Sequence, residues 1–311
     1  MLRLWFLSWW YKGNLNKIKV KKRKQKESHQ KLKSEFGGVY GRLAKDYSDL
    51  FESELWRRNN EELKRVFLPY LPFCFLRNWV VARMMFVTRG GAWVKKERVE
   101  LEKCFGKKRL QRLLEEEWVG CPIIQEGKYL TSRNSIHHLY HIARFIERTE
   151  VDLTKVQTVV EWGGGYGNFC RLFLKVGKPG MTYVLVDTPL FSTVQWLYLS
   201  VVIGETKVNL VTKKESRIKQ GIVNIVPVQL ADELSLECDL FVSTWGLSEA
   251  NKKTVDLVMR RNWFGASHFL VAFQKGESKF PVADRVRKEM EQKGVAFERV
   301  EFPMGSKYAF K

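Results

Sequence analysis

The segment VVEWGGGYGNFC, residues 159–170, contains the residue types and spacing that most directly indicate chemistry. Four glycines lie within residues 163–167, after a β-branched pair and before an apolar stretch with helical character. A loop that leaves the carboxyl end of a strand and enters a helix can bring a ligand against bare backbone and helix N–H groups, where Cβ atoms would obstruct it. We call residues 163–167 the glycine loop, and its setting predicts a site for a nucleotide-like cofactor.

An acidic residue at a fixed distance from the glycine loop supports this interpretation. Asp187 ends the strand-like run TYVLVD, where a carboxylate can accept hydrogen bonds from both hydroxyls of a ribose. The dinucleotide fingerprint G-x-G-x-x-G does not fit, because its last glycine would fall on Asn168. The loop glycines alternate instead, and Glu161 stands two residues ahead of the first of them.

The elements that must position these residues alternate from about residue 157 onward. Short β-rich runs are separated by helical ones, and the five runs are QTVVEW, TYVLVD, VNIVPVQ, CDLFVSTW and HFLVAFQ. This alternation predicts right-handed βαβ units and a parallel sheet with helices on both faces. Two further strand-like runs, AFERVEF and SKYAF, are separated by the turn-forming PMGS and predict an antiparallel hairpin. The expected fold is therefore an α/β, Rossmann-like sheet of parallel strands ending in an antiparallel hairpin.

The region before this sheet has a different pattern. From about residue 40 to 150, charged and apolar residues mix at spacings of three and four, as in SELWRRNNEELKRVFLPYL and KKRLQRLLEEEWV, which indicates helices. We therefore expect three parts: a basic amphipathic tail over 1–34, a helical substrate-binding or lid region over 35–150, and a cofactor-binding domain over 151–311.

The combination of an E-x-G-x-G-x-G pattern after the first strand, an acid ending the second and a terminal hairpin resembles the class I S-adenosylmethionine-dependent methyltransferases. Within that class, the chain from roughly Ser48 onward is similar to the sugar O-methyltransferase family, most of whose members are themselves named by inference. The likeness rests on the segments SELW, VGCPI, YLTSRNSIHHLYHIARF, EWGGGYGNF, VDTPLFSTVQWLYLS and DLFVSTWGLSEA.

The resemblance implies S-adenosylmethionine as cofactor and gives roles to individual positions. The alternating glycines would approach the methionine part and the ribose, Glu161 would orient the loop or the amino group, and Asp187 would bind the ribose diol. Adenine would lie near the end of the third strand, where many relatives place an acid and this sequence has Gln229, with Asp232 a little later. The expected cofactor residues are Glu161, Gly163, Gly164, Gly165, Gly167, Asp187 and Gln229.

The acceptor side is expected near the end of the fourth strand, which lies beside the methyl group in such a fold. Methyl transfer is an in-line displacement, so it needs a positioned hydroxyl first and a base second. Glu249 would accept the proton or bind a sugar hydroxyl together with Ser248, and the alternative is a helix N-terminal residue favoured by the macrodipole. Trp245 and Tyr166 would stack on a sugar face or serve as ordinary packing.

The segment SIHHLYHIARFIERT predicts a helix with an apolar stripe opposite a face that carries His137, His141, Arg144 and Arg148. This face could receive the diphosphate of a nucleotide sugar or an acidic glycan, with His137 or His141 as the base. The alternative is a solvated basic face. His138 lies between the two faces and is another candidate base. No metal site is predicted, because no carboxylate accompanies the histidine pair on that face.

The net charge of +20 is concentrated at the start of the chain, where residues 1–34 hold eleven Lys and Arg against Glu27 alone. A fold that grips nucleic acid should carry such charge across its surface rather than on a tail, so nucleic acid is not the expected partner. The run MLRLWFLSWWY is far shorter than the roughly 20 apolar residues that cross a bilayer. Its aromatic residues and the following lysines fit a peripheral anchor on anionic lipid, with a disordered basic tail or a misassigned start codon as alternatives.

The cysteines have no paired spacing and stand mostly among apolar neighbours; they are Cys74, Cys104, Cys121, Cys170 and Cys238. This usage predicts reduced, buried thiols in a cytoplasmic protein.

Three functional hypotheses follow. The first is a cytoplasmic enzyme that methylates a sugar hydroxyl of a polysaccharide, lipid-linked glycan or nucleotide sugar, held at the inner face of a membrane by the tail. The second is an RNA or DNA methyltransferase, favoured only by the basic charge. The [DNS]-P-P-[FYW] motif used for exocyclic base amines is absent, since the corresponding stretch is STWGLSEA, which leaves methylation of ribose or a ring carbon of RNA. The third is a non-catalytic methyltransferase-fold subunit of glycan machinery.

Overall fold

The computed structural model describes residues 2–85, 87, 91–125, 128–233, 235, 237–276, 280–300 and 306–311, with the backbone alone for residues 2–14, 49 and 92. Its centre is an eight-stranded sheet with the strand order β3-β4-β2-β1-β5-β6-β8-β7. The strands are β1 (Thr158–Trp162), β2 (Thr182–Asp187), β3 (Val208–Leu210), β4 (Val223–Pro227), β5 (Leu240–Thr244), β6 (His268–Phe273), β7 (Ala296–Arg299) and β8 (Lys307–Phe310).

This sheet confirms the predicted α/β architecture. Neighbouring strands from β3 to β6 pair in parallel, and β8 is antiparallel to both β6 and β7. One parallel strand was not predicted: β3 spans three residues at the edge of the sheet, too few to show an alternating pattern. Most of the predicted turn PMGS lies outside the described residues.

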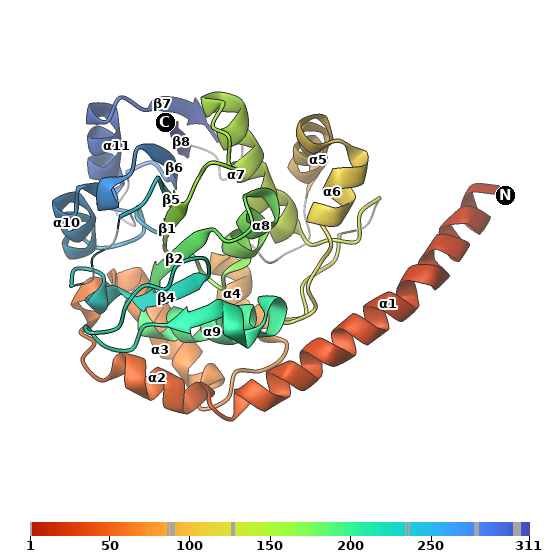
Figure 1. Ribbon diagram of the computed structural model, residues 1–311, viewed down its shortest axis with the longest axis horizontal. Helices are drawn as coiled ribbons and strands as arrows, with labels where there is room; N and C mark the ends of the chain where they lie inside the picture. The colour runs from red at the N-terminus through yellow and green to blue at the C-terminus, as the bar shows by residue number, and fades with distance from the viewer. Residues whose placement is uncertain are drawn as a thin grey trace.

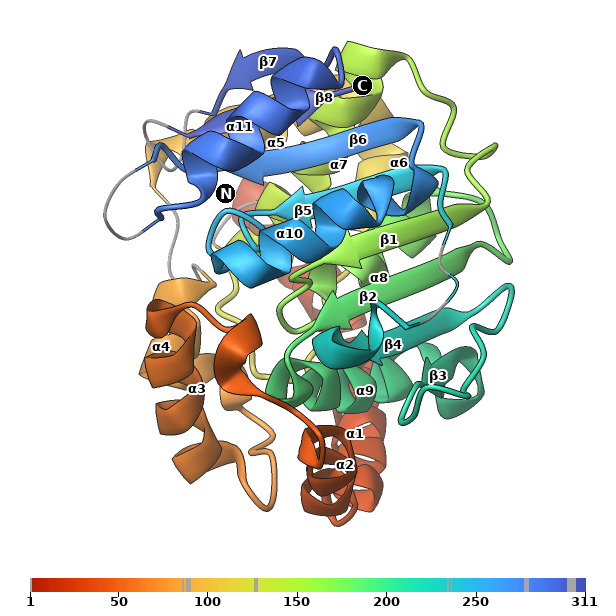
Figure 2. The same cartoon turned by 90° about the vertical axis from the view of Figure 1, so that its left-hand side faces the viewer.

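Helices cover both faces of the sheet, with α10 and α11 on one face and α7, α8 and α9 on the other (Figure 2). Side chains alternate along each strand, so β1 directs Val160 toward one core and Val159 toward the other. Both cores are apolar, which explains why the central strands read as continuous hydrophobic runs. These helices are α7 (Arg133–Thr149), α8 (Asn168–Val176), α9 (Pro189–Ile203), α10 (Lys252–Arg260) and α11 (Ala283–Gln292).

The sheet reverses its winding beside β1, because β2 pairs with one edge of β1 and β5 pairs with the other. The loops that follow β1 and β5 therefore diverge, and a crevice opens at the carboxyl ends of these strands. Helices α3 and α4 stand at this end of the sheet (Figure 2).

The helices before residue 133 extend the core on the α7 side. They are α2 (Phe36–Ala44), α3 (Glu54–Phe67), α4 (Trp79–Met84), α5 (Ala92–Phe105) and α6 (Lys107–Leu113). Helix α5 packs along α7, and α2 packs along α9. The helix expected over 107–119 ends early at Leu113, because the following segment turns Glu116 and Glu117 into the interior.

Helix α1 (Leu2–Lys33) is continuous, and its N-terminal end leads away from the rest of the molecule (Figure 1). Its second half is part of the fold: Gln25 Oε1 accepts a hydrogen bond from Trp118 N at 2.7 Å, and His29 and Leu32 are buried. The side chains of the aromatic run at the start lie outside the described residues. Among the described residues, no helix is long and apolar enough to cross a bilayer.

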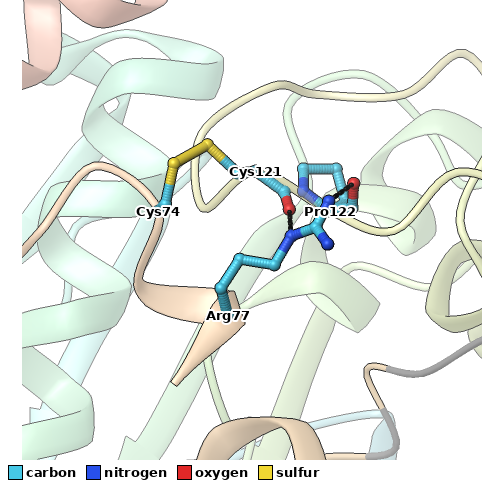
Figure 3. Close-up of a disulfide and its surroundings, with 4 residues drawn as sticks. All are labelled: Cys74, Arg77, Cys121 and Pro122. Atoms are coloured by element: carbon cyan, nitrogen blue, oxygen red, sulfur yellow. Dashed lines mark hydrogen bonds between the residues drawn. A yellow bond between two sulfur atoms is a disulfide. The ribbon is translucent and has the colours of Figure 1, made fainter. Parts of the chain in front are cut away.

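Two of the five cysteines form a disulfide, Cys74–Cys121, so the prediction that all five are reduced is wrong (Figure 3). Backbone hydrogen bonds align the two segments, since Gly120 N donates to Phe73 O at 2.8 Å. Arg77 Nε also donates to Cys121 O at 2.6 Å. The partners are 47 positions apart, a separation that carries no pairing signal in the sequence. Cys170 and Cys238 are buried as predicted, whereas Cys104 is exposed.

Candidate active site

A cavity that is open to solvent lies at the carboxyl ends of β1, β2 and β5. The glycine loop, Asp187 and the loop after β5 form one wall, and the start of α3, the end of α4 and the first turns of α7 form the other. The crevice expected from the strand order is thus bordered on its other side by α3, α4 and α7.

The glycine loop serves packing as well as ligand access. A Cβ on Gly163, whose φ is +75°, would stand 2.7 Å from the backbone of Gly246, so this position must be bare for the loops after β1 and β5 to meet. Gly165, with φ +56°, faces the cavity, and its Cβ would come within 3.3 Å of Met85 Cε. Gly164 also lines the cavity, whereas Gly167 caps α8 away from the wall. Gly165 is therefore the loop position most exposed to a ligand.

Asp187 lies in the cavity wall at the end of β2, as the sequence pattern indicates. Its Oδ2 accepts hydrogen bonds from Gly165 N at 3.2 Å and from Gln195 Nε2 at 2.9 Å, and its Oδ1 accepts one from Thr188 N at 2.8 Å. Burial raises the pKa of Asp187 to about 7, and these donors oppose the rise. The carboxylate thus ties the glycine loop to the end of β2.

Glu161 lies in β1 directly beneath the glycine loop. Its side chain is buried, and Tyr183 Oη donates a hydrogen bond to Glu161 Oε2 at 2.7 Å. Burial raises the pKa of Glu161 to about 8, with a smaller contribution in the same direction from the nearby Asp187. Two acids whose charged forms are disfavoured by burial therefore share one wall of the cavity.

The described residues fit a nucleoside cofactor in this place. Thr188 Oγ1 is buried and has no hydrogen-bond partner within the described part of the chain, and Thr188 follows Asp187 in the wall. A ribose supplies two donors for a carboxylate, and bare backbone at Gly165 leaves room for it.

Gln229, the residue expected to contact adenine, bonds to another part of the protein instead. Gln229 Nε2 donates to Leu43 O at 2.7 Å, and the side chain does not line the cavity. Its neighbour Val228 does, so the wall after β4 is apolar. Asp232 is bonded to Arg260 at 2.7 Å outside the cavity.

Glu249 lies in the cavity wall. It precedes α10 and is not part of that helix, because Asn251 caps the helix. Its Oε2 accepts a hydrogen bond from Trp56 Nε1 at 2.9 Å, and its Oε1 accepts one from Gln274 Nε2 at 2.6 Å. Burial raises its pKa. Ser248 bonds to Gln274 and lies behind the wall. Both carboxyl oxygens of Glu249 therefore hold protein donors.

The three histidines of α7 separate into different environments. His137 and His138 line the cavity, whereas His141 lies behind it with Nδ1 bonded to Tyr308 Oη. His138 Nδ1 is 3.1 Å from Asn168 Nδ2, and burial lowers the pKa of His138 to about 3. Burial lowers the pKa of His141 as well. The ring of His137 bonds instead to a carboxylate, that of Glu97.

The polar face of α7 is mostly an internal contact surface: its interpretation as a solvated basic face is wrong for the buried His137, His141 and Arg144, whereas Arg148 is half exposed. Arg144 donates to both carboxyl oxygens of Glu298 in β7, and Arg148 also bonds to Glu298. Arg144 does not line the cavity. Helix α5 contacts this face at His137, and strands β7 and β8 contact the rest of it, which a helical wheel of one segment cannot show.

Trp245 and Tyr166 both line the cavity. Tyr166 is buried and packs edge-on against Tyr198, with ring centroids 5.1 Å apart. Trp245 is partly exposed, follows β5 with a φ of +75° and packs edge-on against His141, with ring centroids 6.1 Å apart.

Several wall residues had no signal in the sequence. Arg133 and Asn134 line the cavity from the first turn of α7, and Asn134 Nδ2 donates to Met85 O at 2.7 Å. Behind them, the fully buried Arg171 donates to Ser135 Oγ at 2.7 Å and lies 3.3 Å from Glu116. The hydrogen bond to Ser135 joins α8 to α7, the ion pair joins α8 to the segment after α6, and these partners meet only in the folded chain.

Comparison with known proteins gives limited similarity. No protein-family model and no curated protein matches the chain. Among solved structures, PigF with SAH is similar over 54% of this chain and 59% of PigF, with 13% identity and a TM-score of 0.35. Aeropyrum pernix fibrillarin with natively bound S-adenosyl-L-methionine is similar over 54% of this chain and 73% of its own, with 13% identity and a TM-score of 0.37.

NcsB1, an O-methyltransferase from neocarzinostatin biosynthesis in complex with S-adenosylmethionine, is similar over 57% of this chain and 56% of its own. The identity is 12% and the TM-score is 0.35. At these values the neighbours carry no argument about activity, and the fold assignment rests on the strand order described above.

Proposed function

We propose that this protein is an S-adenosylmethionine-dependent O-methyltransferase that acts on a sugar hydroxyl of a polysaccharide, lipid-linked glycan or nucleotide sugar. The observation that carries the proposal is Asp187, which ends β2 in the wall of the cavity and is bonded to the backbone of Gly165. When bound there, the cofactor supplies an electrophilic methyl group to the acceptor oxygen.

The residues of the cavity divide into those that hold the cofactor and those that exclude water. Asp187 and Thr188 bind the ribose hydroxyls, and Glu161 orients the glycine loop from below. Trp56, Met85 and Phe191 form an apolar wall that shields the reacting groups from bulk water. Val228 offers an apolar surface to the adenine ring.

The identity of the segments that line the cavity supports a sugar as the acceptor. The segments that carry the resemblance to sugar O-methyltransferases contribute wall residues: SELW supplies Trp56, the α7 segment supplies Asn134 and His137, and STWGLSEA supplies Trp245 and Glu249. Trp245, a partly exposed residue of the cavity wall, offers an aromatic ring for the apolar face of a sugar.

We also propose that the enzyme is cytoplasmic and contacts the inner face of an anionic membrane through the basic helix α1, whose N-terminal end leads away from the rest of the molecule (Figure 1). The disulfide is unusual for a reducing compartment. Fractionation of the source cells tests this placement: recovery of the protein with the cytoplasm or with the inner face of the membrane supports it, and recovery outside that membrane contradicts it.

The function is tested by transfer of radiolabelled methyl from S-adenosylmethionine into two pools from the source cells, a glycan-plus-lipid fraction and a nucleic-acid fraction. We expect label in the glycan pool, lost in the Asp187→Ala variant. Label in nucleic acid would favour the RNA methyltransferase. Binding of S-adenosylhomocysteine without label in either pool would favour the non-catalytic subunit.

A further inference from the structure

The chain between α2 and α3 runs along the cavity from the end of β4 to the start of α10. At one end, Leu43 O accepts a hydrogen bond from Gln229 Nε2, just after β4. At the other end, Glu52 O accepts a hydrogen bond of 3.0 Å from Nδ2 of Asn251, the residue that caps α10. Residues 51–53 of this connection line the cavity. A part of the N-terminal region therefore borders the side of the cavity where the adenine ring is expected.

This side of the cavity has apolar surface for a flat base. Val228 and Phe51 both line the cavity, and Phe51 packs against the same apolar core that contains Val228. A ligand of this kind also needs a few polar groups that fix its orientation. The chain after β4 does not supply them, because Gln229 is bonded to Leu43 and Asp232 to Arg260. A side chain that recognises the edge of the base has to come from another element.

Glu52 has a carboxylate oxygen to offer at this place. Its Oε1 accepts a hydrogen bond of 2.8 Å from Tyr47 Oη, which holds the carboxylate in one orientation. Its Oε2 has no hydrogen-bond partner within the described part of the chain, and the side chain is partly exposed in the cavity wall. Burial is the main cause of the raised pKa of Asp187, and the charge of Glu52 adds to it, so the two carboxyl groups lie near each other.

We propose that Glu52 recognises the adenine ring by accepting a hydrogen bond from its 6-amino group, an inference that rests on the proposed function. A carboxylate can only accept and the 6-amino group of adenine donates, so the two are complementary. A base with a carbonyl oxygen at this position would place a second acceptor against the carboxylate. The acid expected at the end of the third predicted strand is thus supplied by the connection between α2 and α3.

The test is a calorimetric comparison of two ligands, S-adenosylhomocysteine and its analogue in which hydrogen replaces the 6-amino group. The wild type should bind the analogue at least about tenfold more weakly, because a hydrogen bond to a charged acceptor is lost. Glu52→Ala should bind the two ligands with affinities within about twofold of each other. The ratio compares two ligands on the same protein, so a smaller fraction of folded protein does not change it.

Two further variants are controls for this ratio. Glu54 lies close to Glu52 in the sequence, but it is paired with Arg57 and Arg58 and does not line the cavity. Glu54→Ala should therefore keep both wild-type affinities. Asp187→Ala should weaken both ligands and keep the ratio between them, because the ribose is the same in both.

The outcomes separate the two proposals. Wild-type protein that binds neither ligand contradicts the proposed function itself. Wild-type protein that binds both ligands equally well keeps the proposed function and removes Glu52 as the residue that recognises the base. The same ratio in Glu52→Ala as in the wild type also overturns the inference, because another group then accepts from the 6-amino group.

Discussion

Trp56 Nε1 donates a hydrogen bond of 2.9 Å to Glu249 Oε2, across 193 positions of sequence. Trp56 lies in the first turn of α3, and Glu249 lies in the loop that follows β5. The indole also meets Phe191 of α9 edge-on, with ring centroids 5.4 Å apart. These two contacts hold the start of α3 against the loop after β5 and against α9. The two elements lie on opposite sides of the point where the sheet reverses its winding.

Removing this donor should loosen the closure of the cavity. Trp56→Phe keeps an aromatic ring beside Phe191 but leaves a carboxyl oxygen of Glu249 without its donor, which should cost about 1–3 kcal/mol of unfolding free energy. Urea denaturation measures this loss. Trp79→Phe is the matched control, because Trp79 is exposed on α4, and its change should stay within about 0.5 kcal/mol. Equal effects at both positions would show that the hydrogen bond does not fasten α3.

The raised pKa of Asp187, about 7, and of Glu161, about 8, make the cofactor-free protein sensitive to pH. In the folded state these two carboxyl groups keep their protons up to about pH 7 to 8, whereas in the unfolded chain they release them near the ordinary pKa values of Asp and Glu. Their contribution to the unfolding free energy is therefore fully present at low pH and is lost as pH rises through about 7 to 8. We therefore expect the unfolding free energy to fall between about pH 5 and about pH 8, with a smaller slope in Asp187→Asn.

The affinity for the cofactor should rise with pH, whereas the unfolding free energy should fall. Ribose hydroxyls donate to the ionised form of Asp187, so binding should tighten as pH rises through about 7 and should release a proton. Calorimetry in buffers with different ionisation heats counts that proton. Affinity that is independent of pH in this range would show that Asp187 does not titrate on binding.

The bare backbone of the glycine loop predicts a steric effect. Gly165→Val places a branched side chain between the cavity and Met85 and should abolish binding of S-adenosylhomocysteine. Gly180→Val is the control, because Gly180 has a similar positive φ of +75° and a Cβ added there would meet nothing within 4 Å. Circular dichroism checks that both variants fold. Tight binding by Gly165→Val would mean that the ligand does not approach this position.

The basic surface of α1 should bind anionic vesicles at low salt. Replacing the exposed Lys17, Lys19, Lys24 and Lys26 by Gln should release the protein, since each base near the surface contributes about 1 kcal/mol. The control replaces four exposed lysines elsewhere: Lys107, Lys108, Lys252 and Lys288. Co-sedimentation with phosphatidylserine vesicles measures both, and a wild type that stays in solution would contradict the membrane contact.

Local patterns were sufficient for most of the sheet. The run TYVLVD coincides with β2, and the apolar stretch expected to be helical after the glycine loop coincides with α8, because hydrophobic periodicity within one segment determines both. Features that depend on distant partners were missed or misread. The Cys74–Cys121 disulfide and the burial of Arg144 against Glu298 arise only when segments far apart in the chain meet.

The candidate site shows the same division. Asp187 and Gly165 could be predicted, since a strand, a glycine loop and a second strand are contiguous in sequence. Glu97 could not, because it contacts His137 from another helix and carries no motif of its own. Gln229 was placed correctly after the third predicted strand, but its side chain bonds to Leu43 in α2.

The most direct test of the cofactor site is a calorimetric titration of S-adenosylhomocysteine into the wild type and Asp187→Ala, with Asp232→Ala as a matched acid outside the cavity. Binding to one site in the wild type and in the control, weakened at least about tenfold by Asp187→Ala, is the predicted result. No binding by the wild type, or equal affinity in all three proteins, would contradict the assignment of this cavity to S-adenosylmethionine.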